Sequence, residues 1–413
     1  MRQALVVVSC LILLLASARA EDAPATAAKA AVDVEVARLM THVRWLAAPE
    51  RKGRGAWPER EASAAYIAQA FAAAGLKPLP GRDSMFVDKA GLKQPALRNV
   101  VAWLPGPKGA AGEHVILSSH YDHLGQKVTE IRDGETVTRT TMTFAGADDN
   151  ASGVAALLEI ARCLGAQHKA DPKAFPRSLV FVAFDLEETN LLGSRHYVQE
   201  PPLPLAGCAA FLTMDMLGRS VGDMVPGSLF VMGGESSAVL AKQVVAGGEP
   251  KGGKTIKVGI DFQPGYSDYV AFQEAKIPFL FLTSGACEDY HQTGDVAARI
   301  QGAHLRARAR WAQDLTMRIV ASPTRPTWRD GVPPSVAELK DVRALIKTIE
   351  AEIAKVPGLP PMATAMVTNY GAYLDKLLAD DQVTLEERTN ARNGALNLFR
   401  MAQQMAVVMN AQR

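Results

Sequence analysis

Hydrophobic positions along the chain follow two alternating patterns. Short, nearly continuous apolar runs occur at residues 99–104, 115–119, 179–184, 209–214 and 278–283. Such runs are typical of strands that are covered on both faces of a sheet. Between them, apolar residues recur at three- and four-residue spacing, which predicts helices. The predicted helices span residues 36–46, 61–74, 152–164, 191–198, 236–246, 268–275 and 304–321. This alternation predicts an α/β fold, a three-layer sandwich with a mixed, largely parallel central sheet.

Two segments depart from this alternation. Residues 127–144 are rich in Thr and Val and contain Asp133-Gly134, which predicts a surface hairpin. Residues 323–334 contain four prolines and predict a linker to an all-helical extension over residues 335–413.

Two capping boxes mark helix starts in this extension, at Ser335-x-x-Glu338 and Thr384-x-x-Glu387. The apolar seam from Leu339 to Ile353 is an interaction surface. Packing onto its own neighbouring helices is favoured over dimerisation, because the seam is short for a coiled coil. The chain is accordingly expected to be a monomer, or a dimer through the helical extension.

The N-terminal segment has the pattern of a signal peptide. Arg2 is followed by an apolar run and then by Ala18-Arg19-Ala20, an A-x-A cleavage site. We therefore expect residues 1–20 to be removed, and the chain to be exported to the periplasm or the extracellular space. Residues 21–34 are Ala-rich and predict a disordered lead before a catalytic domain at 35–322. No later segment approaches ~20 apolar residues, so stable membrane insertion is not expected.

Composition narrows the possible partners. The formal charge is +2 and no long basic run occurs, so nucleic-acid binding has no electrostatic basis and peptide substrates fit better. Beyond the signal segment the cysteines are Cys163, Cys208 and Cys287. An odd number does not describe a disulfide framework, and at most one bridge can form within a monomer.

Acidic and histidine residues follow the predicted strands. His120, Glu187, Glu188 and Asp215 each stand just after one. Because sites in open α/β sheets gather beyond the carboxyl ends of the strands, we expect these side chains to converge. Mixed nitrogen and oxygen ligands of this kind suit zinc, with cobalt or manganese as possible substitutes.

The loop Gly146-Ala147-Asp148-Asp149-Asn150-Ala151-Ser152-Gly153 places two acids where a helix begins. Aspartates there commonly cap a helix. Alternatively, Asp149 is a carboxylate that bridges two metal ions, because each of its two oxygens can face one ion. Asp148 is then a neighbour that shapes the turn.

Several spaced motifs carry a family resemblance. They are His120-Tyr121-Asp122, the loop at 146–153, Glu187-Glu188, Asp215-Met216-Leu217-Gly218 and Tyr290-His291. In this order they resemble the co-catalytic dizinc aminopeptidases, in particular the secreted bacterial leucyl aminopeptidase branch. The likeness extends from about Val36 to Ala321.

The resemblance implies two zinc ions that share Asp149. His120 and Asp215 would complete the ligands of one ion, and Glu188 and His291 those of the other. It also implies a cis peptide bond between Asp149 and Asn150.

The resemblance assigns further roles near these ligands. Asp122 would orient His120, and Glu187 would be the general base. Tyr290 would stabilise the oxyanion, although a buried structural tyrosine is an alternative. His123, His168 and His196 are interpreted as loop or helix-surface residues.

The leading hypothesis is thus an exported zinc aminopeptidase that cleaves N-terminal residues from peptides. One alternative on the same fold is a single-zinc glutaminyl cyclase. A noncatalytic peptide-binding relative is the other, and the intact ligands and base count against it.

Overall fold

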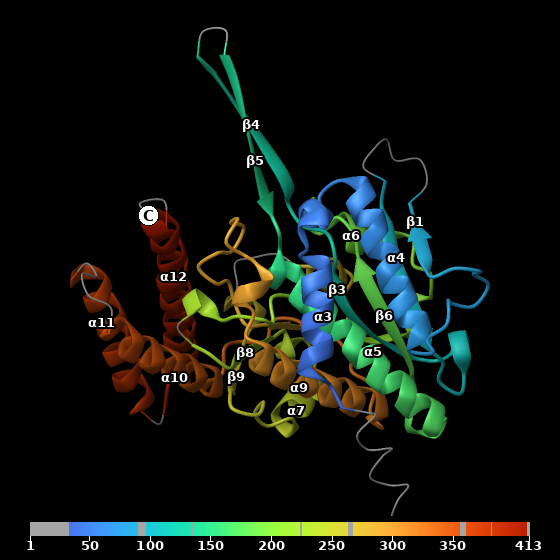
Figure 1. Cartoon of the computed structure of the whole chain (residues 1–413). Coiled ribbons are helices and arrows are strands. Elements are labelled where there is room, and N and C mark those ends of the chain that lie inside the picture. Colours follow the sequence, from blue (N-terminus) through green and yellow to red (C-terminus); the bar gives the residue numbers. More distant parts are fainter. Residues whose placement is uncertain are drawn as a thin grey trace, which may run out of the picture.

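An eight-stranded mixed sheet forms the centre of the computed structural model (Figure 1). The structure describes residues 33–89, 96–133, 136–223, 225–262, 267–355, 361–380 and 382–410. The strand order is β1-β2-β6-β3-β7-β10-β8-β9. The strands are β1 (Phe86–Asp88), β2 (Arg98–Leu104), β3 (His114–His120), β6 (Ser178–Phe184), β7 (Cys208–Met214), β8 (Ser228–Met232), β9 (Lys254–Val258) and β10 (Phe279–Thr283).

Strands β6, β3, β7 and β10 are parallel neighbours, and β8 is parallel to β9. Strand β2 runs antiparallel to both β1 and β6, and β8 runs antiparallel to β10. The sheet is therefore mixed with a parallel centre, which confirms the predicted fold class.

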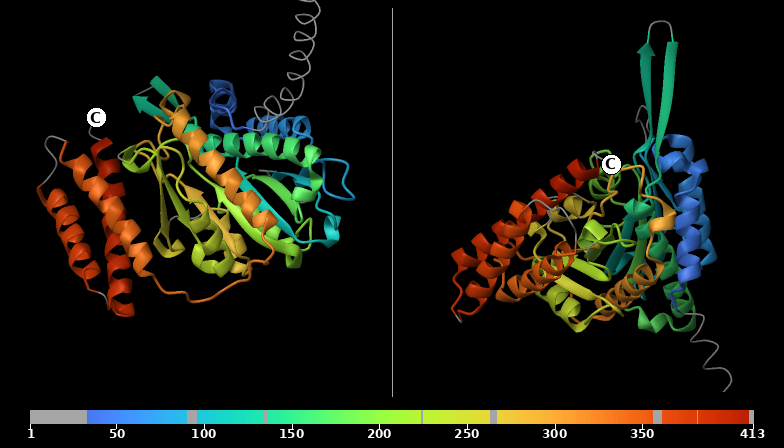
Figure 2. Two further views of the ribbon diagram at one scale, coloured as in Figure 1. Left: turned by 90° about the horizontal axis from the view of Figure 1, so that it is seen from below. Right: turned by 60° about the vertical axis from the view of Figure 1, so that its left-hand side comes forward.

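Helices cover both faces of the sheet and complete three layers (Figure 2). One face carries α3 (Val36–Leu46), α4 (Trp57–Ala73), α5 (Gly153–Ala170), α7 (Ala238–Ala246) and α9 (Gly302–Ala321). The other carries α6 (Leu192–Gln199), α8 (Tyr269–Glu274) and α10 (Val336–Ile353), and α11 (Pro361–Leu378) and α12 (Leu385–Asn410) pack against α10. Leu157 and Leu315 lie in the first apolar core, and Phe272 and Ile346 lie in the second. Each core forms because alternate strand residues point to opposite faces.

The predicted hairpin is present and projects from the body (Figure 1). Within the described part of the chain, strands β4 (Gly125–Asp133) and β5 (Thr136–Phe144) pair only with each other. The base of the hairpin lies against Gly53 and Gly55, where a Cβ on Gly53 would come within 2.1 Å of the Phe144 carbonyl oxygen. Because β4 begins just after His123, the hairpin starts beside the expected site.

The C-terminal helices pack on their own chain. Leu339, Val342 and Ile346 of the apolar seam are fully buried, and α10 lies against β9, α11 and α12. The favoured interpretation of the seam is thus confirmed. Ser335 Oγ accepts a hydrogen bond from the Glu338 amide at 3.0 Å, and Thr384 and Glu387 cap α12 reciprocally, so both capping boxes are formed.

The described chain begins in contact with the body. Asp33 pairs with Arg306 at 2.7 Å and with Arg310 at 2.6 Å, and Val34 is fully buried. The last two residues of the predicted lead are therefore packed. The predicted signal sequence lies outside the described residues.

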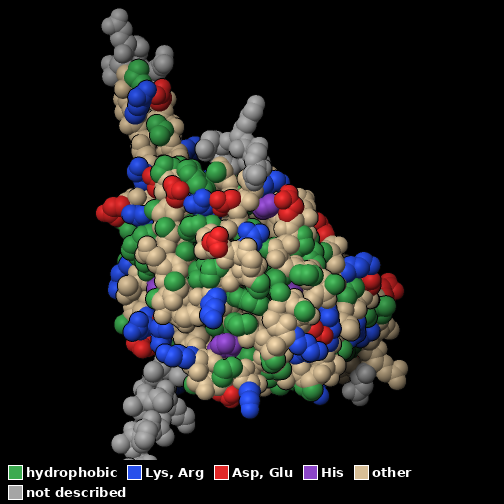
Figure 3. Space-filling model, turned by 90° about the vertical axis from the view of Figure 1, so that its right-hand side faces the viewer, with side chains coloured by type: hydrophobic (Ala, Val, Ile, Leu, Met, Phe, Trp, Pro, Cys, Tyr) green, Lys and Arg blue, Asp and Glu red, His purple; other side chains and the backbone are tan. Residues whose placement is uncertain are grey.

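Other expectations concern the surface and the thiols. Basic and acidic side chains are interspersed over the face in Figure 3, without a large basic patch there. No helix in the described ranges is long and apolar enough to cross a membrane. Cys163, Cys208 and Cys287 are buried free thiols.

Candidate metal centre

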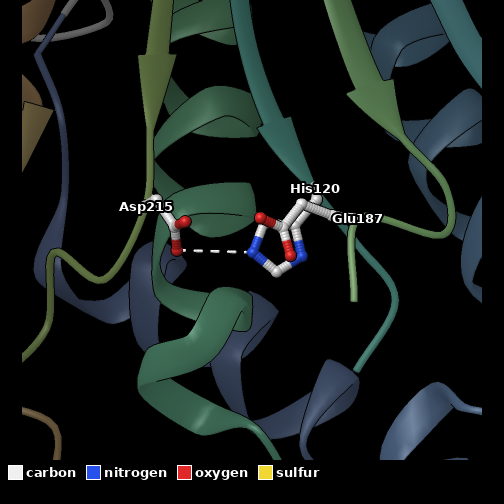
Figure 4. A group of neighbouring side chains, drawn as sticks. All are labelled: His120, Glu187 and Asp215. Atoms are coloured by element: carbon white, nitrogen blue, oxygen red, sulfur yellow. Dashed lines mark hydrogen bonds and ion pairs between the residues drawn. The ribbon is translucent and has the colours of Figure 1, made fainter. Parts of the chain in front are cut away.

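Three parallel strands deliver the predicted side chains to one edge of the sheet. His120 ends β3 and pairs in register with Phe184, the last residue of β6, so that Glu187 lies close by. Asp215 follows β7 directly. Figure 4 shows His120 and Asp215 facing each other with Glu187 beside His120. One ligand atom from each of these three residues lies within 4.8 Å of the others.

Asp149 stands between two groups of side chains: His120 and Asp215 form the first group, and Glu188 and His291 form the second. Its Oδ1 lies 3.3 Å from His120 Nε2, and its Oδ2 lies 3.1 Å from His291 Nε2. Helix α5 begins only at Gly153, and the Gly153 amide donates to Asn150 Oδ1 at 3.0 Å, not to Asp148 or Asp149. The geometry therefore favours the bridging interpretation of Asp149 over the helix cap. The peptide bond between Asp149 and Asn150 is cis, as the resemblance implied.

Distances between side chains test whether a metal fits. His120 Nε2 lies 3.3 Å from Asp215 Oδ1, and His291 Nε2 lies 3.2 Å from Glu188 Oε2. Ligand atoms that share a tetrahedral zinc with bonds near 2.0–2.2 Å are about 3.3–3.5 Å apart. The groups around His120 and His291 both come close to this spacing, so the residues fit zinc.

Electrostatics also favour bound cations. Asp149, Asp215 and Glu187 are all buried, and buried charges need pairing or a metal. Burial and the nearby Asp215 raise the pKa of Glu187 well above its usual value. Burial opposes protonation of His291, but its hydrogen bonds to Asp149 and Glu188 outweigh this and raise its pKa to about 10. The carboxylates thus draw protons toward the site, and a divalent cation can take their place.

Asp122 lies behind His120 and below the Glu187-Glu188 turn. Its Oδ1 is 3.6 Å from His120 Nδ1, and its carboxylate accepts hydrogen bonds from the amides of Glu187 and Glu188 at 3.0 and 3.2 Å. One carboxylate can therefore fix the positions of both glutamates.

Tyr290 lies beside the second group of ligands. Its ring stacks on that of His291 at 3.9 Å between centroids, and 40% of the residue is exposed. Burial and the Asp149 carboxylate both raise the pKa of its phenol, which therefore stays protonated. This exposure contradicts the alternative of a fully buried structural tyrosine.

Arg54 is a supporting residue that the sequence patterns did not mark. Its buried guanidinium donates hydrogen bonds to the carbonyl oxygens of Leu46 and Tyr121 at 2.7 Å and of Ala145 and Gly146 at 2.8 Å. It thus joins α3, the end of β3 and the loop that carries Asp149.

Further polar residues hold the ligands from behind. Asp295 accepts hydrogen bonds from the amides of Asp148 and Asp149 at 2.8 and 3.1 Å. Ser267 donates to Asp215 Oδ2 at 2.9 Å, which leaves Oδ1 toward His120. Asp295 follows the Tyr290-His291 motif closely in sequence, and this nearness was the one signal available for it.

One histidine is not where the sequence interpretation placed it: His196 of α6 is only 4% exposed and is not a surface residue. His123 lies in the loop between β3 and β4, as interpreted, but it is only 2% exposed. His123 Nδ1 lies 2.8 Å from Glu188 Oε1, inside the candidate site. His168 is partly buried and contacts the Pro105 carbonyl at 2.9 Å.

Comparison with known proteins places this geometry in context. By sequence, the chain is similar to Aminopeptidase YwaD of Bacillus subtilis, with 34% identity over 137 residues. The matched residues are 32% of this chain and 27% of that protein. A Probable zinc metalloprotease of Pyricularia oryzae is 30% identical over 156 residues, 38% of this chain and 26% of the relative. The matched region thus spans only about a quarter of these relatives.

Solved structures share the fold at lower identity. Legionella pneumophila LapA aminopeptidase superposes with a TM-score of 0.54 at 18% identity, over 70% of this chain and 73% of that one. Porphyromonas gingivalis glutaminyl cyclase gives 0.51 at 20% identity, over 68% of this chain and 98% of the other.

The decisive match is to a family model. Residues 99–316, more than half of the chain, match Peptidase family M28. This segment contains all five predicted metal ligands together with Glu187, Asp122 and Tyr290. The chain therefore belongs to Peptidase family M28.

Proposed function

We propose that this protein is a two-zinc aminopeptidase that removes N-terminal residues from peptides. The observation that carries the proposal is the position of Asp149, whose two oxygens face His120 on one side and His291 on the other at 3.3 and 3.1 Å. Such a carboxylate offsets the repulsion between two divalent ions. Cobalt or manganese are possible substitutes, because the ligands are nitrogen and oxygen.

Each residue of the site would have a distinct role. His120, Asp149 and Asp215 would hold one zinc, and Asp149, Glu188 and His291 would hold the other. Zinc bound there would supply Lewis-acid chemistry that lowers the pKa of a water and polarises the scissile carbonyl. Glu187 takes a proton from the attacking water and passes it to the leaving amine. Asp122 keeps Glu187 in place through the 3.0 Å bond to its amide.

Tyr290 would complete this arrangement. Its raised pKa keeps the phenol protonated, so that it can donate a hydrogen bond to the developing oxyanion.

Substitution of Glu187 tests the proposal. Glu187→Gln keeps the shape of the side chain but cannot take a proton, so turnover of aminoacyl nitroanilides should fall by about 10²–10⁴-fold. Both zinc ions should remain bound in elemental analysis, because Glu187 is assigned as base and not as ligand. Glu274→Gln is the matched control, since Glu274 is exposed and pairs with Arg195. Unchanged turnover in Glu187→Gln, or loss of a zinc, would refute the assignment.

A glutaminyl cyclase is the second candidate, because the fold is shared with solved cyclases. The two distinct groups of ligands around Asp149 favour two ions over one. An assay with an N-terminal glutamine peptide beside the nitroanilide panel, with and without chelator, separates the functions. Cyclisation without aminoacyl hydrolysis would refute the aminopeptidase, and binding without turnover of either would support a noncatalytic relative.

Export is part of the same proposal. It is supported by the apolar segment that ends at Ala18-Arg19-Ala20. N-terminal sequencing of protein recovered outside the cytoplasm should begin at Glu21, and a chain that retains Met1 there would count against cleavage.

A further inference from the structure

The imidazole of His123 is held rigidly beside the second group of ligands. Its ring packs on Gly146, where a Cβ would lie 2.5 Å from two ring carbons. The ring also meets that of His291 edge-on at 5.8 Å. On the other side, its main-chain amide lies 3.4 Å from the Arg54 carbonyl oxygen. His123 can therefore change position little without displacing the loop that carries Asp149.

Distances separate the roles of His123 and His291 toward Glu188. His291 Nε2 lies 3.2 Å from Glu188 Oε2, close to the spacing of about 3.3–3.5 Å for two atoms that share a tetrahedral zinc. His123 Nδ1 lies 2.8 Å from Glu188 Oε1, which is the length of a hydrogen bond and short for two ligands of one ion. Glu188 Oε2 thus lies near the spacing of two zinc ligands from His291, whereas Glu188 Oε1 lies at hydrogen-bond distance from His123.

The tautomer of His123 follows from its contacts. Nδ1 faces the Glu188 carboxylate, with Asp149 Oδ2 farther away at 3.7 Å. Nε2 is buried and has no hydrogen-bond partner among the described residues. A proton on Nδ1 satisfies the carboxylate, because an ionised carboxylate only accepts hydrogen bonds.

We propose that His123 is a positioning residue for the second zinc. Its Nδ1–H holds Oε1 of Glu188, so that Oε2 is directed toward the ion beside His291. This inference rests on the proposed two-zinc function. It adds to that function a histidine that is not a ligand but determines how well one ligand binds.

The test uses the full chain and measures zinc affinity directly. His123→Leu removes the donor and keeps an apolar side chain in the buried position, whereas His123→Asn retains an N–H near the position of Nδ1. For each variant, the dissociation constants of the two zinc ions are measured by competition with a chromophoric chelator. We expect His123→Leu to weaken one zinc by about 10–100-fold and leave the other unchanged. His123→Asn should bring the weakened constant back to within a few-fold of wild type.

A second buried histidine provides the matched control. His196 is also buried and lies near a glutamate, with Nδ1 3.8 Å from Glu200 Oε1, but on α6. His196→Leu should leave both zinc constants unchanged. A change in the zinc constants similar to that of His123→Leu would mean a general packing effect and would overturn the inference.

Four further outcomes distinguish the inference from its alternatives. Wild-type zinc constants in His123→Leu would overturn the positioning role, and so would failure of His123→Asn to restore binding. Cobalt spectra decide whether His123 is itself a ligand: an altered visible absorption in His123→Asn would overturn the hydrogen-bond role. A wild-type chain that binds no second zinc would instead refute the proposed function.

Discussion

Arg54 gives the sharpest link between the fold and the candidate site. Its fully buried guanidinium donates four hydrogen bonds, all to main-chain carbonyl oxygens at 2.7–2.8 Å. These carbonyls belong to Leu46, Tyr121 and the adjacent pair Ala145 and Gly146, three segments that are far apart in sequence. We predict that Arg54→Met, which keeps the apolar stem and removes the donors, destabilises the protein even without metal.

The magnitude follows from two opposing effects. Each buried carbonyl that loses its donor costs at least about 1 kcal/mol, so four cost roughly 4 kcal/mol. Burial also lowers the pKa of Arg54 to about 10, against the attraction of Asp149 and Asp295. Burying the guanidinium charge there therefore costs free energy. The methionine variant does not have this cost, which offsets part of the loss of hydrogen bonds. We expect a net loss of about 2–4 kcal/mol, or roughly 3–6 °C in Tm for a domain of about 300 residues.

Thermal unfolding in the presence of a chelator measures this loss without any contribution from zinc. Arg325→Met is the control, because Arg325 also donates to a carbonyl, that of Ala206 at 2.7 Å, but is 39% exposed. Its effect should stay below about 1 kcal/mol, as is usual for surface substitutions. A Tm of Arg54→Met within about 1 °C of wild type would refute the reasoning, since it corresponds to less than about 1 kcal/mol.

Two further predictions concern protons and the hairpin. Because hydrogen bonds to Asp149 and Glu188 outweigh burial and raise the pKa of His291 to about 10, zinc must displace a proton there at neutral pH. Its apparent affinity for the second site should therefore fall by up to about tenfold per pH unit as the pH is lowered, and titrations between about pH 6 and 8 that give a constant affinity would contradict this. At Gly53 (φ +69°) an added Cβ would meet the Phe144 carbonyl at 2.1 Å, whereas at Gly81 (φ +75°) it would meet nothing within 4 Å. Gly53→Ala should therefore lower Tm by more than Gly81→Ala, which shares only the left-handed backbone cost of about 1–2 kcal/mol, and equal shifts would rule out the close approach.

The strands and helices of this fold could be predicted because their signals are local. The run from Leu179 to Phe184 is apolar throughout, and the structure places it in the middle of the sheet as β6. Strand β1 was missed, because Phe86–Asp88 is too short to show a pattern. The order β1-β2-β6-β3-β7-β10-β8-β9 also could not be predicted, since strand pairing depends on residues far apart in the chain.

The residues of the site also divide into those that local sequence signals predict and those that depend on distant parts of the chain. His120, Glu187 and Asp215 could be located because each follows a strand whose carboxyl end reaches one edge of the sheet. Arg54 and Asp295 could not, because their partners are main-chain groups up to 147 positions away, and no spacing marks such contacts. His123 was correctly placed in a loop, but its burial in the site was not foreseen, because its environment is formed by the loop at Gly146 and by Glu188, not by its own neighbours in sequence.

The contacts of Asp148, Asp149 and Asn150 give a structural reason for the different roles expected of neighbouring residues in one loop. Asp148 Oδ1 accepts hydrogen bonds from the Gly218 amide at 2.6 Å and from Ser152 Oγ at 3.1 Å. The Asn150 side chain donates to Met214 O at 3.0 Å and accepts from the Gly153 amide at 3.0 Å. Both side chains therefore use their hydrogen bonds to close the loop. Of these three side chains, the carboxylate of Asp149 is the one that faces histidines, namely His120, His123 and His291. This supports its assignment as the bridging ligand.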